Sequence, residues 1–168
     1  MSQINVNNIA NVAGTVNKGV LQVVSTCKTT QFTTTSTSFT DVTGMTATLT
    51  PRSTSSKVLV IITIGCIGNN TAGWQSFVML ERDIGGSSTN LAVNTDASSI
   101  NSSAMWLDNN AYSTGAGSVS FLDSPNTTSA ITYTLQCRAG GNTFSFNRRG
   151  DTADDGTVST ITAMEIQG

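Results

Sequence analysis

The fold class of this chain is decided by one run of apolar residues, Lys57-Val58-Leu59-Val60-Ile61-Ile62-Thr63-Ile64-Gly65. Successive side chains of a β-strand point to opposite faces. The even-numbered residues from Val58 to Ile64 would therefore line one face, and Leu59 and Ile61 the other. Apolar residues on both faces are typical of a strand that is covered on both sides. We expect one face to lie in the core, and Leu59 and Ile61 to lie at a subunit interface.

Segments with the same two-residue period recur from Gly19 onwards. β-Branched residues in such alternation, bounded by turn residues, indicate strands, whereas no segment has the period of a long helix. About eight to ten strands without helices predict a sandwich or a barrel. Residues 84–115 are predicted to be mostly loop, with a short strand at Leu91–Val93, and Gly140-Gly141-Asn142 is predicted to form a tight hairpin. The other expected strands are Val20–Val24, Phe32–Phe39, Met45–Thr50, Trp74–Asp83, Ser118–Leu122, Ile131–Arg138, Thr143–Phe146 and Thr157–Ile166.

The length of 168 residues fits one domain with a short additional arm. Residues 1–18 are polar and rich in Asn, and their apolar residues are too thinly spaced to predict a helix or a long strand. We expect an extended N-terminal arm over residues 1–18 and one β-sandwich domain over residues 19–168. Such an arm gains stability only by lying on another surface, so its apolar side chains are candidate contacts with a neighbouring subunit: Ile4, Val6, Ile9 and Val12.

The composition limits the partners of the chain. Charged residues make up 11% and the net charge is −2, whereas about 25% is typical of soluble proteins. The Arg and Lys residues are scattered and form no basic stripe, so we expect no nucleic acid partner. The longest apolar run, Val58–Ile62, is far shorter than the ~20 residues that cross a bilayer. The N-terminus has no secretory signal pattern, so we expect neither a membrane partner nor export.

Catalysis is not expected, because the chain has no histidine and only two glutamates, Glu81 and Glu165. The aspartates mostly lie in predicted turns, where Asp is favoured without any catalytic role. A carboxylate-dependent glycan hydrolase remains the enzymatic alternative. The loop Arg148–Gly156 departs from the calcium-loop spacing, and we expect internal ion pairs there, with a cation site as the alternative. No metal or cofactor is expected.

The cysteines and aromatic residues also have structural explanations. Cys27, Cys66 and Cys137 are far apart in sequence, and we interpret them as free, small apolar residues in strands, which suits assembly in a reducing cytoplasm. Trp74 and Tyr133 fall within predicted strands and are expected in the core. Trp106 and Tyr112 fall in the predicted loop and are candidates for an exposed contact surface.

Three stretches resemble a domain that is common in virion structural and tail-fibre proteins of tailed bacteriophages. The N-terminal segment Ile4–Thr15 is also similar to lead-in segments of phage appendage proteins. The resemblance covers residues 4–168. Its opening lies in Thr37–Gly44 and Thr50–Val60, its central hairpin in Ser120–Pro125 followed by Ile131-Thr132-Tyr133, and its closing strand in Ser159–Ile166.

The resemblance implies a jelly-roll-like antiparallel β-sandwich that assembles as a homotrimer, without catalytic residues. Tail fibres usually join such a domain to a long shaft, whereas only an 18-residue arm precedes it here. We therefore expect a capsid decoration (cement) protein that binds the major capsid protein or other virion proteins and stabilises the shell. It would be located in the virion after assembly in the host cytoplasm. The alternative is a tail-fibre or head-fibre tip adhesin that binds a host receptor through residues 84–115 and 148–156.

Overall fold

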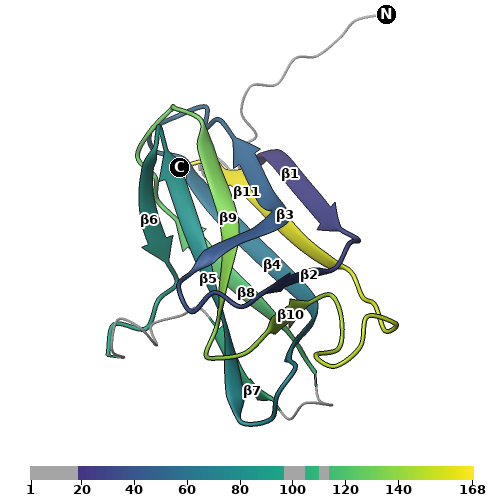
Figure 1. The fold of residues 1–168 in the computed structure, drawn as a ribbon. Coiled ribbons are helices and arrows are strands. Elements are labelled where there is room, and N and C mark those ends of the chain that lie inside the picture. Colours follow the sequence, from purple (N-terminus) through teal and green to yellow (C-terminus); the bar gives the residue numbers. More distant parts are fainter. Residues whose placement is uncertain (1–18, 97–104, 110–113) are drawn as a thin grey trace, which may run out of the picture.

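A computed structural model describes residues 19–96, 105–109 and 114–168. The described residues contain strands and no helix (Figure 1). Consequently, none of them forms an apolar helix of the length that crosses a membrane. The strands are β1 (Val20–Lys28), β2 (Phe32–Thr34), β3 (Thr40–Leu49), β4 (Lys57–Asn69), β5 (Trp74–Ile84), β6 (Ser87–Leu91), β7 (Met105–Asn109), β8 (Gly115–Asp123), β9 (Ile131–Ala139), β10 (Phe144–Phe146) and β11 (Ser159–Ile166).

The strands form two antiparallel sheets that lie against each other. The β4 sheet has the order β1-β11-β4-β10-β2, with β8 also paired to β4. The β9 sheet has the order β3-β9-β5-β6, with β7 also paired to β5. Figure 1 shows the first strand, β1, beside the last, β11, so that the two ends of the described chain meet in one sheet. The predicted all-β, jelly-roll-like antiparallel sandwich is confirmed.

The core lies between the two sheets. From the β4 sheet, Val58, Val60 and Ile62 are fully buried, as alternation along the strand predicts. From the β9 sheet, Ile131, Tyr133 and Leu135 are fully buried as well, as the sequence pattern also predicts. Side chains from both inner faces therefore interdigitate in one apolar layer, the arrangement expected of a β-sandwich.

The two predicted hairpins around β9 are wrong. β9 belongs to the β9 sheet, whereas β8 and β10 both pair with β4. The segment at Gly140–Asn142 therefore crosses between the sheets. The Gly140 amide donates to the Gln75 carbonyl at 2.8 Å, which keeps it beside β5, and Asn142 turns the chain with a φ of 57°. Turn residues mark the change of direction in the sequence but do not say which sheet the next strand joins.

Two further predictions need correction. In the described part of residues 84–115, two strands occur where loop and a short strand at Leu91–Val93 are predicted: β6 ends at Leu91, and β6 and β7 both pair with the long strand β5. The polar sequence of β6 hides this strand, since four of its five residues are exposed at the sheet border. Trp74 is not in the core: it is 42% exposed at the start of β5, and a Cβ atom added to Gly141 would clash with its ring.

Candidate interaction surface

The outer face of the β4 sheet combines residues from four neighbouring strands. Alternation places Val58, Val60 and Ile62 in the core, so Leu59, Ile61 and Thr63 point outward from β4. Leu59 and Ile61 are half-buried. The adjacent strands β1, β11 and β8 alternate in the same way. We call twelve outward-pointing residues in the middle of these strands the β1–β8 face: Val23, Ser25, Cys27, Thr160, Thr162, Met164, Leu59, Ile61, Thr63, Ser118, Ser120 and Leu122.

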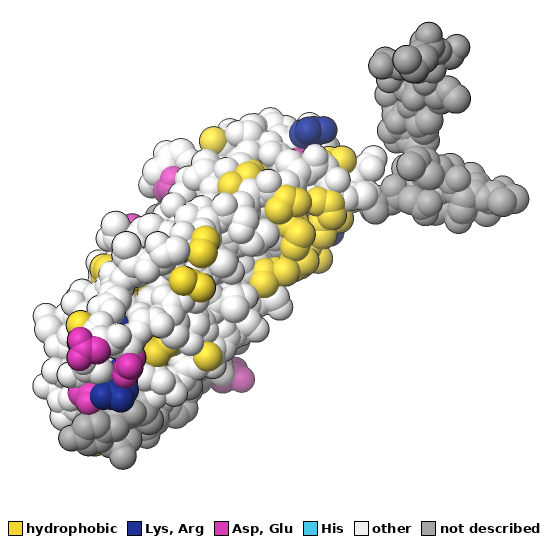
Figure 2. All heavy atoms as spheres, turned by 90° about the vertical axis from the view of Figure 1, so that its right-hand side faces the viewer, with side chains coloured by type: hydrophobic (Ala, Val, Ile, Leu, Met, Phe, Trp, Pro, Cys, Tyr) yellow, Lys and Arg dark blue, Asp and Glu magenta, His cyan; other side chains and the backbone are white. Residues whose placement is uncertain are grey.

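One row of apolar side chains crosses the whole β1–β8 face. The register pairs Val23 with Met164, Met164 with Leu59, and Leu59 with Leu122. These four residues, one from each strand, are called the apolar row below. Val23 and Leu122, at its two ends, are 56% and 51% exposed. Figure 2 shows hydrophobic side chains gathered in a patch on the side of the molecule that carries β1.

The rest of the β1–β8 face is neutral. In the next row of the face, two positions along each strand from the apolar row, the register aligns Ser25, Thr162, Ile61 and Ser120. The Ser25 and Thr162 hydroxyls are hydrogen-bonded to each other at 2.8 Å, so part of the polar surface is already satisfied within the sheet. The residues named above are uncharged, but Lys57 points outward from β4 two positions before Leu59 and adds one positive charge at the margin of the face, where it donates to Ser124. The face therefore favours contact with another neutral, partly apolar surface.

The strand β1 borders this face and pairs only with β11 among the described strands. An unpaired strand edge offers backbone hydrogen-bonding groups to other chains, and soluble proteins usually protect it with charges, proline or a short strand. β1 spans nine residues, without proline, and its only charged residue is Lys28 at its end. Within the part of the chain that the structure describes, the outer edge of β1 is therefore free to pair with another strand.

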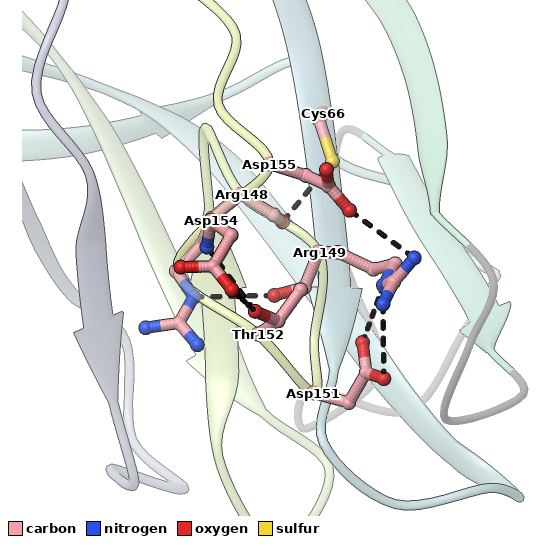
Figure 3. A network of polar contacts seen from close by, with 7 residues as sticks. All are labelled: Cys66, Arg148, Arg149, Asp151, Thr152, Asp154 and Asp155. Atoms are coloured by element: carbon pink, nitrogen blue, oxygen red, sulfur yellow. Dashed lines mark hydrogen bonds and ion pairs between the residues drawn. The ribbon is translucent and has the colours of Figure 1, made fainter.

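The loop Arg148–Gly156 is charged, and several of its charged side chains bond to one another within the loop. Figure 3 shows Arg149 between two carboxylates, with Nε donating to Asp151 at 2.6 Å and Nη1 lying 3.1 Å from Asp155. The hydrogen bond from Arg149 lowers the pKa of Asp151. Thr152 donates to Asp154 at 3.1 Å. The predicted internal ion pairs are confirmed, and within the described residues no group of three or more Cys, Asp or Glu side chains is arranged to hold a metal ion.

The three cysteines differ in environment. Burial raises the pKa of the Cys137 thiol to about 12 and also raises the pKa of Cys66, which donates to the Arg148 carbonyl at 3.1 Å. Both are therefore neutral thiols and poor nucleophiles at physiological pH. Cys27 is exposed on the β1–β8 face and is not bonded to another cysteine. A small open pocket next to Cys66 is lined by Gly65, Arg149 and other residues of this end of the sandwich.

Two buried carboxylates have structural partners. Asp123 accepts from Arg82 at 2.8 Å and from the Tyr133 hydroxyl at 2.8 Å, which joins β5, β8 and β9. Glu165 on β11 accepts from Gln22 at 2.6 Å and from the Arg52 amide at 2.7 Å. Both side chains point into the sandwich, so they tie strands together and do not contribute to the outer face.

The structure brings some of the predicted site residues together, and others lie elsewhere or outside the described residues. It brings Leu59 and Ile61 together with Val23, Met164 and Leu122, which sequence reasoning did not identify. Alternation in β1, β8 and β11 marks each outward-pointing residue, but only the register shows that four of them form a row. Trp106 belongs to β7. Ile4, Val6, Ile9, Val12 and Tyr112 lie outside the described residues.

Comparison with known proteins adds no identification, because no family model and no curated protein matches this chain.

Proposed function

We propose that this chain is a structural subunit of a tailed-bacteriophage particle, namely a capsid decoration protein that binds and stabilises the shell as a homotrimer. The observation that carries the proposal is the uncharged β1–β8 face with its apolar row. A side of a sandwich that exposes Val23 and Leu122 next to half-buried Leu59 and Ile61 has the properties of a contact surface. The sequence resemblance to virion proteins gives the particle as its setting.

The mechanism is binding without chemistry. Full burial of an exposed Val, Leu or Met side chain contributes about 1.5–3 kcal/mol, and each side chain of the row gains only part of this, because Val23 and Leu122 are 56% and 51% exposed and Leu59 and Met164 are already half-buried. Several such contacts, repeated over many copies, would offset the cost of association and resist expansion of the shell. In the loop Arg148–Gly156, Asp151 and Asp155 pair with Arg149 and Asp154 accepts from Thr152, whereas Asp123 and Glu165 are buried. Their partners give these acidic groups structural roles.

The proposal is tested by locating the protein on intact particles of the virus that encodes it. Cryo-electron microscopy with gold-labelled antibody should place it on the capsid at regular positions, and particles that lack it should lose DNA at a lower temperature. Addition of the purified protein should restore their heat resistance. Labelling of the tail or a fibre tip, with unchanged capsid stability, would reject the decoration role in favour of the adhesin.

A further inference from the structure

We infer that the bond between Asp155 and Gly156 is a site of spontaneous covalent modification, at which the aspartate isomerises to isoaspartate as the protein ages. The sequence offers this reaction one favoured place. Residues 155 and 156 form the only Asp-Gly pair of the chain, and no Asn-Gly pair occurs. This chemistry belongs to the loop Arg148–Gly156 and is independent of the proposed function.

The reaction is intramolecular and needs no reactant other than water. The Gly156 amide nitrogen attacks Cγ of the protonated Asp155 carboxyl. A new C–N bond forms, the C–OH bond breaks, and the hydroxyl leaves as water with the amide proton, which closes a five-membered succinimide ring. Water then opens the ring. Attack at the Cγ carbonyl restores aspartate, whereas attack at the main-chain carbonyl leaves Gly156 linked through Cγ, which is isoaspartate.

The carboxyl group that must react is accessible. The Asp155 side chain is 62% exposed, and its ion pair with Arg149 is a surface pair with Nη1 3.1 Å away (Figure 3). Such exposed pairs contribute little free energy, so this one opens readily. Asp123 provides the contrast, because it is buried and accepts hydrogen bonds from Arg82 and Tyr133. Of these two aspartates, Asp155 is therefore the one whose carboxyl is free to reorient.

The attacking nitrogen is not held by the strand pairing beside it. Arg148 and Gly156 form an isolated antiparallel bridge, and the Thr157 amide donates to the Asn147 carbonyl at 3.1 Å. Hydrogen-bonded and non-hydrogen-bonded pairs alternate in antiparallel pairing. Since Asn147 and Thr157 are the hydrogen-bonded pair, Arg148 and Gly156 are the other kind, and the Gly156 amide points away from the neighbouring segment.

The loop also has room for the ring at this position. A Cβ atom added to Gly156 would come no closer than 3.8 Å to its nearest listed neighbour, Gln31 Nε2. At Gly150 in the same loop, an added Cβ would clash with the backbone of Asn69. Because Gly156 has no side chain and open surroundings, neither its own atoms nor its neighbours shield the nitrogen.

The product changes a defined part of the surface. In isoaspartate the main chain gains one carbon and the carboxylate is attached directly to Cα. We expect the pair between Asp155 and Arg149 to be lost. Asp155, Gly156 and Arg149 also line the small pocket beside Cys66, so the wall of this pocket changes as well.

The first test follows the full-length chain during several weeks at neutral pH. Trypsin cleaves after Arg149, the last basic residue, and releases Gly150–Gly168. Chromatography with electron-transfer fragmentation should find isoaspartate at Asp155, preceded by a form one water lighter, and none at Asp151 or Asp154, whose next residues carry side chains. Methyl transfer from S-adenosylmethionine by an isoaspartyl methyltransferase measures the amount.

The free peptide Gly150–Gly168, incubated in parallel, separates the reactivity of the sequence from that of the folded loop. The folded chain should react within about tenfold of the peptide rate, because an exposed loop opens at little cost in free energy. Product in the peptide but none in the folded chain would overturn the inference.

Two variants test the assigned atoms. Asp155→Glu retains the charge beside Arg149 but would need a six-membered ring, so the product should be lost. Asp155→Asn should react faster than the wild type, because a neutral amide needs no prior protonation and releases ammonia on ring closure. An unchanged signal from Asp155→Glu would place the reaction elsewhere. A stable Asp155→Asn chain would show that the Gly156 nitrogen does not reach the side chain, and either result refutes the site.

Discussion

At the scale of single residues, Glu165 is the side chain whose charge state is most closely tied to the fold. It is fully buried, yet it accepts hydrogen bonds from Gln22 and the Arg52 amide. Burial opposes ionisation, but these hydrogen bonds outweigh it, so the net effect is a lowered pKa of Glu165. The carboxylate thereby ties β1 and the segment after β3 to β11.

This arrangement predicts an acid-sensitive contribution to stability. Because the pKa of Glu165 is lower in the folded chain than in the unfolded chain, its contribution is complete above about pH 4.5 and is lost as the pH falls toward the folded-state pKa. Glu165→Gln should reduce the free energy of unfolding at pH 7 by about 2 kcal/mol and by less at pH 3. Urea denaturation at both values measures this. A loss that is equal at both values would contradict the assigned charge, and exposed Asp154→Asn serves as the control.

Asp123 carries the second residue-scale prediction. It accepts from both Arg82 and Tyr133 and is 4% exposed. Asp123→Asn removes the charge but leaves the Arg82 cation partly buried beside it, so the free energy of unfolding should fall by about 3 kcal/mol. Exposed Asp41, which accepts from Gln136, is the matched control, and Asp41→Asn should cost less than about 1 kcal/mol. Chemical denaturation compares them, and equal losses would mean that the buried cluster has no special role.

At the scale of elements, β4 has two chemically similar faces with different environments. Val60 points into the core and is fully buried, whereas Leu59 points outward in the apolar row and is half-buried. Neighbouring residues of one strand thus offer a direct comparison between core packing and surface contact.

Val60→Asp should abolish folding, because an unpaired buried charge costs several kcal/mol, a large part of the total stability of such a domain. Leu59→Asp should leave a folded chain, since its side chain reaches solvent. Circular dichroism and proteolysis distinguish the two. A soluble, protease-resistant Val60→Asp protein would mean that the strand is placed wrongly, as would unfolding by Leu59→Asp alone.

The elements also show how far the sequence predicts this structure. Alternation of apolar residues predicts β4, the inward face of β9 and the position of β11, because burial imposes a two-residue period on each of them. It fails for β6, whose border position permits polar residues, and for the connections around β9, because a turn looks the same whether it joins one sheet or two. The apolar row depends on register between β1, β11, β4 and β8, which are distant in the sequence, so no local pattern reveals it.

At the scale of the whole molecule, the described sandwich contains the core, and attachment is predicted to depend on the N-terminal arm. The core residues all lie between Val42 and Ala163, and β1 begins only at Val20. Folding and attachment are therefore predicted to be separable by changes at the N-terminus.

Deletion of residues 2–18 should leave a domain whose melting temperature is within a few degrees of the wild type, because a loss of less than about 1 kcal/mol shifts it by no more than about 4 °C. The same deletion should remove binding to particles, measured by co-sedimentation with capsids that lack the protein. Conversion of Ile4, Val6, Ile9 and Val12 to Ser in the full-length chain keeps the length of the arm and removes only its apolar contacts. This variant should bind as poorly as the deletion. Normal binding by both would show that attachment resides in the sandwich, and normal binding by the Ser variant alone would mean that the arm acts through its backbone or its polar residues.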